Sequence, residues 1–472
     1  MVHLKHYAFI GLLLGLVSWV SVCSLGLTQP ALTLQQQVAD YAAQGLGTRA
    51  VAALLMTPDG TEMAFAGKTG NSTHPVPTAD TLFEIGSITK VFTALLLADQ
   101  VNQGVVTLST PIDELLPGDA SFPISLQSLA SHTAGLPRLP LSKSLKAILY
   151  PANPYRGSRP EDLYRAIAPT DSEPATCQYS NLGPALLGQL LATAAGQPYE
   201  ALVQTQVLTP LGLADTHFAL DPETTERLAQ GHRENTLPTA NWQLDAYAPA
   251  GGLKSTVTDM GRFLAAAMAA DWPPLALSLQ PYSKDCEPNF GLGWVFTELE
   301  DAPMVMHNGR TGGYYAFLGW LPEAGRGLVL LTSTSDAQGN QVAAALLTGQ
   351  ALPSPDISFG TLMLTAFLGG MLIVQAWSLA YPPRQGDRFE CIKNGVETLL
   401  ILALSYQLGP WQWLPIALWW WLLALLVGLS MRRLWQLRAL FPTKVSTPGY
   451  RWRSLRLVPT LLVLGWAIFC LR

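Results

Sequence analysis

The sequence predicts an α+β fold in which helices flank an antiparallel sheet, with a mostly helical subdomain between the strands and an all-α membrane bundle after them. Strand-like patterns occupy residues 50–67 and return over residues 304–334. The stretch between them is rich in Leu, Ala and Pro and has few β-branched runs, which is typical of helices and loops. Strands at both ends of one domain then pair across this insertion, so the sheet is expected to join distant segments.

The chain of 472 residues is longer than one average domain, and its apolar residues are unevenly distributed. Lys5 and an apolar run over residues 7–20 precede small residues at 24–26. This order predicts either a secretory signal peptide or an uncleaved N-terminal anchor. The expected division is residues 1–27 for that segment, 28–351 for a folded domain, 352–357 for a linker and 358–472 for a transmembrane domain.

Local patterns place the elements of the folded domain in order. A turn at residues 58–60 separates two strands within residues 50–67. Ser87 precedes an apolar run over residues 91–101 that has helical length and spacing, so this serine is expected at the start of a helix. The other predicted elements are helices at 32–46, 182–195, 198–211 and 338–347, and strands at 312–321 and 327–334.

The C-terminal region has the composition of membrane helices. Residues 358–380 carry no charge and are long enough to cross the roughly 30 Å hydrocarbon core of a bilayer. Further apolar runs at 395–408, 413–431 and 457–471 raise the expected number of membrane helices to about four. Basic residues cluster over 432–456 with no acidic residue among them, which predicts a cytoplasmic loop. This topology puts the folded domain on the extracytoplasmic side of the cell membrane, with membrane lipid around the tail.

Charge and cysteine content exclude several classes of protein. The net charge is −5 and no basic stripe occurs in the folded domain, which argues against a nucleic-acid partner. We expect no metal and no cofactor. The chain has five cysteines, of which only Cys177 and Cys286 lie in the folded domain, so at most one disulfide is possible there and their pairing stays open.

The motif Ser87-x-x-Lys90 supplies a candidate nucleophile and base. Residues three apart on a helix share a face, so the two side chains are expected to meet. A serine hydroxyl becomes a good nucleophile when a neighbouring base takes its proton, and a partly desolvated lysine can do so. The positive potential at the helix N-terminus favours an oxyanion and opposes protonation of the lysine. By itself this short motif also fits an ordinary helix with a solvated lysine.

Tyr179 and Asn181 form a second short motif, which could supply a further base and a hydrogen-bonding amide to the Ser87 and Lys90 pair. A phenol beside a cationic lysine is expected to have its pKa of about 10 lowered, so that Tyr179 could act as a base. The Asn181 amide could hydrogen-bond both Lys90 and a substrate carbonyl.

A third motif, His307-Asn308-Gly309, is followed by Arg310 and a glycine-rich stretch. Glycine lets a substrate backbone approach a strand closely, and pairing with a strand edge could hold a peptide-like acyl chain.

These three motifs, in this order, resemble the Ser-x-x-Lys, Tyr-x-Asn and Lys/His-x-Gly signatures of the serine β-lactamase and penicillin-binding superfamily, in particular class C β-lactamases, DD-peptidases and related esterases. The resemblance extends over about residues 30–350 and includes matching stretches at 131–137, 208–213 and 251–256. It implies a β-lactamase/transpeptidase-like fold and a serine hydrolase that acts on a β-lactam, a D-amino-acid peptide or an ester.

The resemblance also implies roles for individual residues. Ser87 would be acylated, and Lys90 and Tyr179 would share the acid and base roles. The substrate-binding residues would be Asn181, His307, Gly309 and Arg310, with the backbone N–H groups of Ser87 and Arg310 forming the oxyanion hole. His132 would be a structural loop residue.

Two departures from the family keep the function open. Most class C enzymes have lysine where His307 stands, and a histidine is mostly neutral at pH 7, so it would hold a substrate carboxylate less strongly. Secreted β-lactamases also lack a membrane tail. The first hypothesis is therefore a tethered D-alanyl-D-alanine carboxypeptidase or β-lactamase. The alternatives are an esterase for small esters and a sensor of β-lactams or peptides that is acylated without turnover and coupled to the membrane helices.

Overall fold

The computed structural model describes residues 32–44, 49–117, 124–144, 153–167 and 177–354, together with isolated residues and pairs of residues between 369 and 428. The predicted N-terminal segment (1–27) and nearly all of the predicted tail (358–472) lie outside these residues. Within the described part of the chain, no helix combines the length and the apolar character that crossing a bilayer requires.

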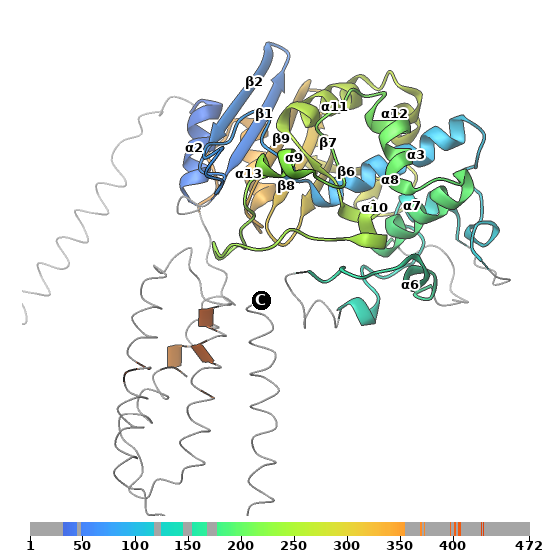
Figure 1. The fold of residues 1–472 in the computed structure, drawn as a ribbon. Helices are drawn as coiled ribbons and strands as arrows, with labels where there is room; N and C mark the ends of the chain where they lie inside the picture. Colours follow the sequence, from blue (N-terminus) through green and yellow to red (C-terminus); the bar gives the residue numbers. More distant parts are fainter. Residues whose placement is uncertain are drawn as a thin grey trace, which may run out of the picture. The chain divides into compact units, whose positions relative to one another are not determined.

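A seven-stranded sheet with the strand order β2-β1-β9-β8-β7-β6-β5 is the centre of the domain (Figure 1). All neighbouring strands are antiparallel, and β1 pairs with β9 through partners such as Val51 and Thr332. The predicted antiparallel sheet made of distant segments is therefore confirmed. Its strands are β1 (Val51–Thr57), β2 (Gly60–Ala66), β5 (Asn289–Phe290), β6 (Val295–Leu299), β7 (Ala302–Arg310), β8 (Tyr315–Leu321) and β9 (Arg326–Thr332).

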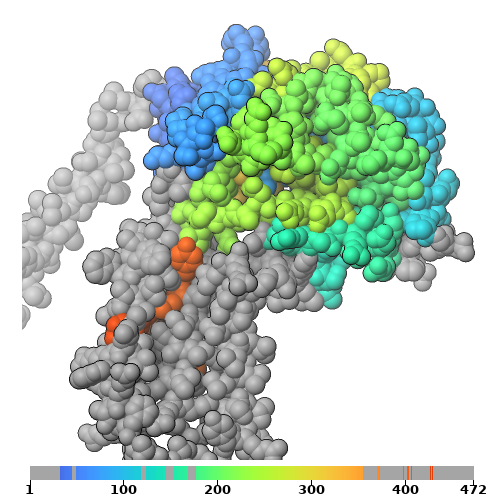
Figure 2. All heavy atoms as spheres, in the orientation of Figure 1, coloured from blue at the N-terminus to red at the C-terminus, as the bar shows by residue number. Residues whose placement is uncertain are grey.

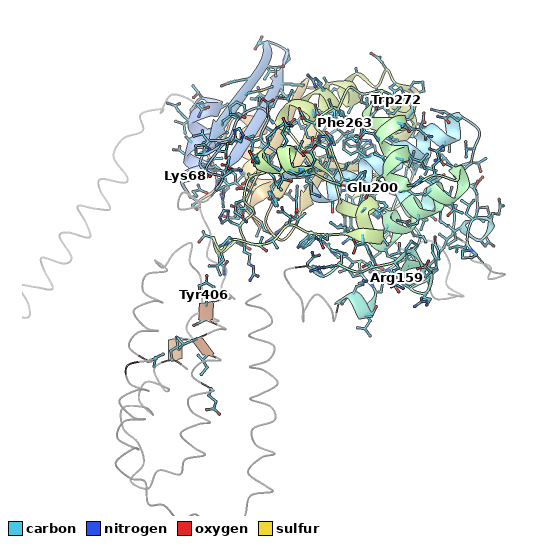
Figure 3. The ribbon with its side chains drawn as sticks, in the orientation of Figure 1. Lys68, Arg159, Glu200, Phe263, Trp272 and Tyr406 are labelled. Carbon is cyan, nitrogen blue, oxygen red and sulfur yellow. A yellow bond between two sulfur atoms is a disulfide. The ribbon has the colours of Figure 1, made fainter. Side chains whose placement is uncertain are left out.

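Each face of the sheet is covered by helices, because side chains alternate between two apolar faces along the strands. On one face, α2 (Leu34–Ala43) and α13 (Gly339–Thr348) pack against the strands β1, β2, β8 and β9. On the other face lies α11 (Val257–Ala269), where Phe263 contacts Phe92 and Trp294 at ring-centroid distances of 4.5 and 5.9 Å; Phe263 is labelled in Figure 3.

The helix α3 (Thr89–Asn102) lies between α11 and the helical subdomain, and all of its residues up to Ala98 are buried. This explains why its apolar residues do not follow one stripe, since a helix that is apolar all round belongs in a core. Figure 2 shows the β1–β2 hairpin in blue at one end of the domain and the segment after α3 in lighter blue at the other.

The helical subdomain follows the prediction in outline. Its longest helix is α7 (Leu182–Ala195), with α8 (Tyr199–Val203) and the π-helical turn η3 (Gln204–Leu208) after it. The shorter elements of the domain are β3 (Phe83–Glu84), η1 (Gly86–Ile88), η2 (Ile112–Glu114), α4 (Leu126–Ala130), α6 (Pro160–Tyr164), α9 (Pro222–Glu226), η4 (Asp245–Tyr247), α10 (Ala248–Gly251), β4 (Lys254–Ser255) and α12 (Pro273–Ser278).

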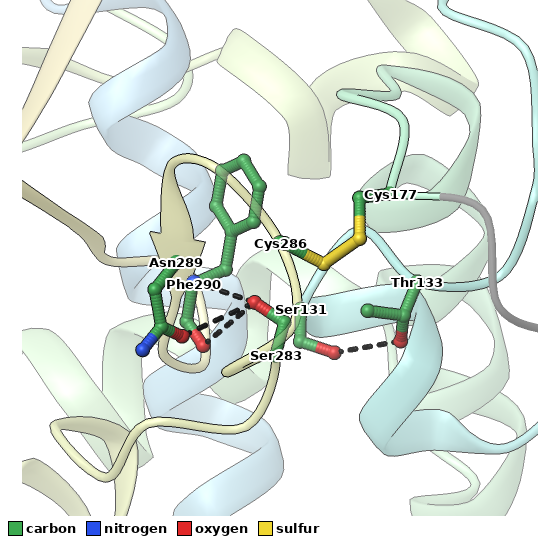
Figure 4. The surroundings of a disulfide bond; sticks show 7 residues. All are labelled: Ser131, Thr133, Cys177, Ser283, Cys286, Asn289 and Phe290. Atoms are coloured by element: carbon green, nitrogen blue, oxygen red, sulfur yellow. Dashed lines mark hydrogen bonds between the residues drawn. A yellow bond between two sulfur atoms is a disulfide. The ribbon is translucent and has the colours of Figure 1, made fainter.

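A disulfide joins Cys177 and Cys286, which are 109 residues apart in the sequence. The question that the sequence left open is thereby answered. Figure 4 shows the bond beside the loop that holds Ser131 and Thr133, with Phe290 of β5 nearby. The bond therefore links the segment that leads into Tyr179 to the loop that leads into β5.

Candidate active site

Ser87 lies in the 3₁₀ turn η1, and Lys90 lies in the first turn of α3 directly after it. The Lys90 Nζ atom is 2.8 Å from Ser87 Oγ and donates a second hydrogen bond of 2.8 Å to the Ala250 carbonyl. The lysine side chain is 1% exposed. Burial lowers the pKa of Lys90 well below its usual value, and the nearby charge of Arg138 lowers it further. Burial thus favours the neutral form of the Lys90 amine, which is in position to accept the Ser87 proton.

Tyr179 meets the same serine, but its ionisation differs from the prediction. Burial raises the pKa of Tyr179 to about 12, although a side-chain hydrogen bond with Ser87 and the charge of Arg138 both act to lower it. The expectation of a lowered tyrosine pKa is wrong because the phenol is desolvated. Its lysine neighbour, with Nζ 5.1 Å from the ring centroid, itself favours the neutral form. Tyr179 is thus protonated and suited to give a proton.

His132 accepts hydrogen bonds from the residues directly before and after Tyr179. The backbone N–H of Gln178 donates to the His132 carbonyl at 3.0 Å, and the backbone N–H of Ser180 donates to His132 Nδ1 at 3.3 Å. The two rings also contact each other, with centroids 4.6 Å apart. His132 has a φ of 59°, in the left-handed region that histidine rarely adopts. The sequence indicated only a structural loop residue here, and its role beside Tyr179 depends on contacts between distant segments.

Asn181 is the residue before α7, and its neighbours differ from the expectation. Its side-chain amide donates to the Tyr155 hydroxyl at 3.2 Å rather than holding Lys90. Its backbone N–H donates to the Arg138 carbonyl at 3.0 Å. Neither Tyr155 nor Arg138 was singled out from the sequence. The only signal was that Arg138 directly follows the stretch 131–137, which resembles the family.

The strand β7 packs closely against η1, and glycines make this approach possible. A Cβ on Gly309 would lie 1.9 Å from the Ile85 carbonyl oxygen and 2.8 Å from the Ser87 nitrogen. A Cβ on Gly86, whose φ is 50°, would lie 3.0 Å from the Arg310 nitrogen. The backbone nitrogens of Ser87 and Arg310 therefore lie at the same junction, which is the arrangement that an oxyanion hole needs.

The register of β7 also leaves part of its edge open. The N–H of Thr311 donates to the Tyr314 carbonyl at 3.0 Å, and the next pair is Arg310 with Tyr315. Hydrogen-bonded and non-hydrogen-bonded pairs alternate in antiparallel sheets, so the N–H and C=O of Arg310 point away from β8. The strand β6 pairs with β7 only as far as Met306. The edge of β7 at Arg310 is therefore free of β6 and open to an extended substrate.

His307 is buried, with 1% of its surface exposed. Burial is the main cause that lowers its pKa to about 3, and a positive charge on Lys90, when that amine is protonated, acts in the same direction. The hydrogen bond with the Asn308 carbonyl, which lies 2.6 Å from Nδ1, opposes the shift. The other ring nitrogen, Nε2, has no hydrogen-bond partner within the described part of the chain. His307 is thus neutral near pH 7 and offers no positive charge to a substrate.

An open cleft of about 1170 Å³ adjoins these groups. Tyr179 and His307 line it, and so do Cys286 and Phe290 from the loop tied by the disulfide. Residues of the second and third motifs therefore line one cleft, and Ser87 adjoins it through its side-chain hydrogen bond with Tyr179.

Comparison with known proteins agrees with this geometry. The family model described as Beta-lactamase matches residues 35–352. The chain is 28% identical over 346 residues to the D-alanyl-D-alanine-carboxypeptidase/endopeptidase AmpH of Escherichia coli, covering 66% of this chain and 86% of that protein. It is 30% identical over 317 residues to a β-lactamase of Pseudomonas fluorescens, covering 58% of this chain and 85% of that protein.

Solved structures share the fold. The β-lactamase/D-alanine carboxypeptidase of Pseudomonas syringae aligns with a TM-score of 0.57 at 20% identity, over 68% of this chain and 98% of that one. A class C β-lactamase of Rhodobacter sphaeroides aligns with a TM-score of 0.55 at 22% identity, over 66% of this chain and 96% of that one. The chain belongs to the Beta-lactamase family and is a serine hydrolase of the β-lactamase and DD-peptidase type.

Proposed function

We propose that this protein is a membrane-tethered extracytoplasmic hydrolase that forms an acyl-enzyme at Ser87 with a β-lactam or a peptide ending in D-alanine. The observation that carries the chemistry is the 2.8 Å contact between Ser87 Oγ and a buried lysine whose pKa is lowered. The names of the relatives support the substrate class, since they include both a D-alanyl-D-alanine carboxypeptidase and a β-lactamase.

The mechanism follows from the protonation states. Neutral Lys90 accepts the proton of Ser87 while Oγ forms a bond to the substrate carbonyl carbon. The negative charge that develops on the carbonyl oxygen faces the N–H groups of Ser87 and Arg310. Protonated Tyr179 gives its proton to the leaving nitrogen as the acyl bond breaks, and the Lys90 ammonium replaces that proton. Water then hydrolyses the ester on Ser87 with the same two groups acting in reverse.

An esterase is the second candidate, and the neutral His307 favours it. A site without a charge at this position does not require a carboxylate on the substrate. Turnover of short p-nitrophenyl esters without any penicillin adduct would support this candidate over the first.

The proposal is tested by incubating the full-length protein with a fluorescent penicillin and measuring the intact mass. We expect a single adduct on the wild type and none on Ser87→Ala. A wild type without an adduct, or an equal adduct on Ser87→Ala, would refute the β-lactam version. The lifetime of the adduct then separates fast hydrolysis from a stable acyl-enzyme.

The proposed tethering rests on the uncharged run over residues 358–380 and on the basic loop over residues 432–456. Protease protection in spheroplasts tests it. External protease should cleave the hydrolase domain and spare the basic loop, and the reverse pattern would contradict the topology.

A further inference from the structure

We propose that Arg138 is the cation that binds a substrate carboxylate in this site, so that the protein selects anionic acyl substrates although residue 307 is a histidine. The inference rests on the proposed function and adds the charge of the substrate to it. A free D-amino-acid carboxyl group and the carboxylate of a penicillin share this chemistry.

The position of Arg138 is set by the catalytic segment itself. Its guanidinium carbon is 5.3 Å from the centroid of the Tyr179 ring. Its carbonyl accepts the N–H of Asn181 at 3.0 Å, and the carbonyl before it, of Pro137, accepts the hydroxyl of Ser180 at 2.8 Å. Pro137 and Arg138 are therefore hydrogen-bonded to Ser180 and Asn181, the two residues that follow Tyr179. The Arg138 guanidinium lies over the Tyr179 ring.

Arg138 is also a cation beside the site that has no acidic partner within the described residues. The ion pairs of that part of the chain involve other arginines. Arg310, next to the oxyanion site, pairs with Glu234 at 3.1 Å and donates to the Ser335 hydroxyl at 2.8 Å. Lys284 lines the cleft and has no ion pair among the described residues either, but it is Arg138 whose guanidinium lies over the Tyr179 ring. An exposed arginine without a carboxylate of its own is available for one that arrives with the substrate.

The chemistry of the guanidinium suits this role. Its planar fork of donors matches the two oxygens of a carboxylate, and such charge-assisted pairs are stronger than neutral hydrogen bonds. The positive charge of Arg138 also acts on Lys90 and Tyr179, lowering the pKa of each. That second effect is the same for every substrate, so it cancels when an acid substrate is compared with its neutral counterpart.

The test compares matched substrate pairs on the full-length protein. One pair is a penicillin and its methyl ester, and the other is an N-acyl-D-alanyl-D-alanine and its C-terminal amide. The measured quantity is the ratio of kcat/KM for the acid to that for the neutral partner. In Arg138→Gln we expect this ratio to fall by about 10- to 100-fold, with Arg138→Lys in between. A lower ratio for the penicillin pair alone, for the peptide pair alone or for both shows which substrate carboxylate Arg138 binds.

Arg165→Gln is the matched control, because it removes the same charge from a side chain that is 76% exposed and paired with Asp162. Its ratio should stay at the wild-type value. Raising the ionic strength should lower the ratio of the wild type and leave that of Arg138→Gln unchanged, since exposed charges are screened by salt. Equal losses for the acid and the neutral partner in Arg138→Gln would overturn the inference while the adduct on Ser87 still forms. A wild type without any adduct would instead refute the proposed function.

Discussion

Gly309→Ala tests whether the contact between β7 and η1 creates the oxyanion site. The new Cβ would lie 1.9 Å from the Ile85 carbonyl oxygen and 2.8 Å from the Ser87 nitrogen. Neither neighbour is the end of a flexible side chain, so the backbone itself must move. Clearing the oxygen from 1.9 Å to at least 3.0 Å needs a displacement of about 1.1 Å, and a misplacement of about 1 Å can cost roughly 100-fold in rate.

We therefore expect Gly309→Ala to slow acylation by about 100-fold or more, which is also the cost of removing one oxyanion donor. The assay is single-turnover acylation by a fluorescent penicillin, measured well below the Tm of each variant. Asn308→Ala is the control in the same strand, since it removes a 2.7 Å hydrogen bond to Asn340 and adds no atom at the junction of β7 and η1. A wild-type acylation rate in Gly309→Ala, at an unchanged Tm, would refute the argument.

Three further predictions concern the surroundings of Tyr179. His132→Ala should lower kcat about tenfold with little change in KM, because the hydrogen bond to the Ser180 N–H is lost. His132→Asn keeps an acceptor and tolerates the left-handed backbone, so it should recover most of the rate. Equal rates for the two variants would contradict the positioning role of His132. Cys286→Ser should lower stability by about 2–5 kcal/mol and lower the Tm, as should a reductant on the wild type, and an unchanged Tm would count against it. Because acylation needs neutral Lys90, its rate should fall as the pH falls through the lowered pKa of this lysine. Tyr179 has a pKa of about 12, so the rate should not decline between pH 7 and 10 through loss of its proton. A stopped-flow measurement of the acylation rate against pH tests both expectations.

The fold was predictable where the signal is local. The hairpin β1–β2 follows from alternation around the turn at residues 58–60, and α7 follows from a long apolar pattern that ends near Gly196. The strands β5 and β6 were not predicted. They are short, with β5 covering only Asn289–Phe290, and glycines at 291 and 293 separate them. Their pairing depends on the neighbouring strand β7 and not on their own sequence.

The composition of the site was predictable and its electrostatics were not. Spacing alone indicated that Ser87 and Lys90 share a helix face, because three-residue spacing fixes that geometry. The pKa of Tyr179 was expected in the wrong direction, since no sequence pattern reports how deeply the phenol is buried. The contacts of His132 and Arg138 with the Tyr179 segment join residues more than forty positions apart, so they also required the fold.

The resting site holds little charge in its interior, and this bears on how it lowers a barrier. Lys90 and His307 have lowered pKa values and Tyr179 a raised one, each chiefly because of burial, so all three favour their neutral forms. Charge appears there only when Ser87 attacks the substrate carbonyl, as its proton reaches Lys90 and the substrate oxygen becomes negative. The ammonium and the backbone donors then interact with that oxyanion more strongly than with the neutral substrate, which is the condition for accelerating a reaction rather than merely binding. The charge on Arg138, which has no ion pair among the described residues, is exposed, where it can recruit a substrate without the cost of a buried ion.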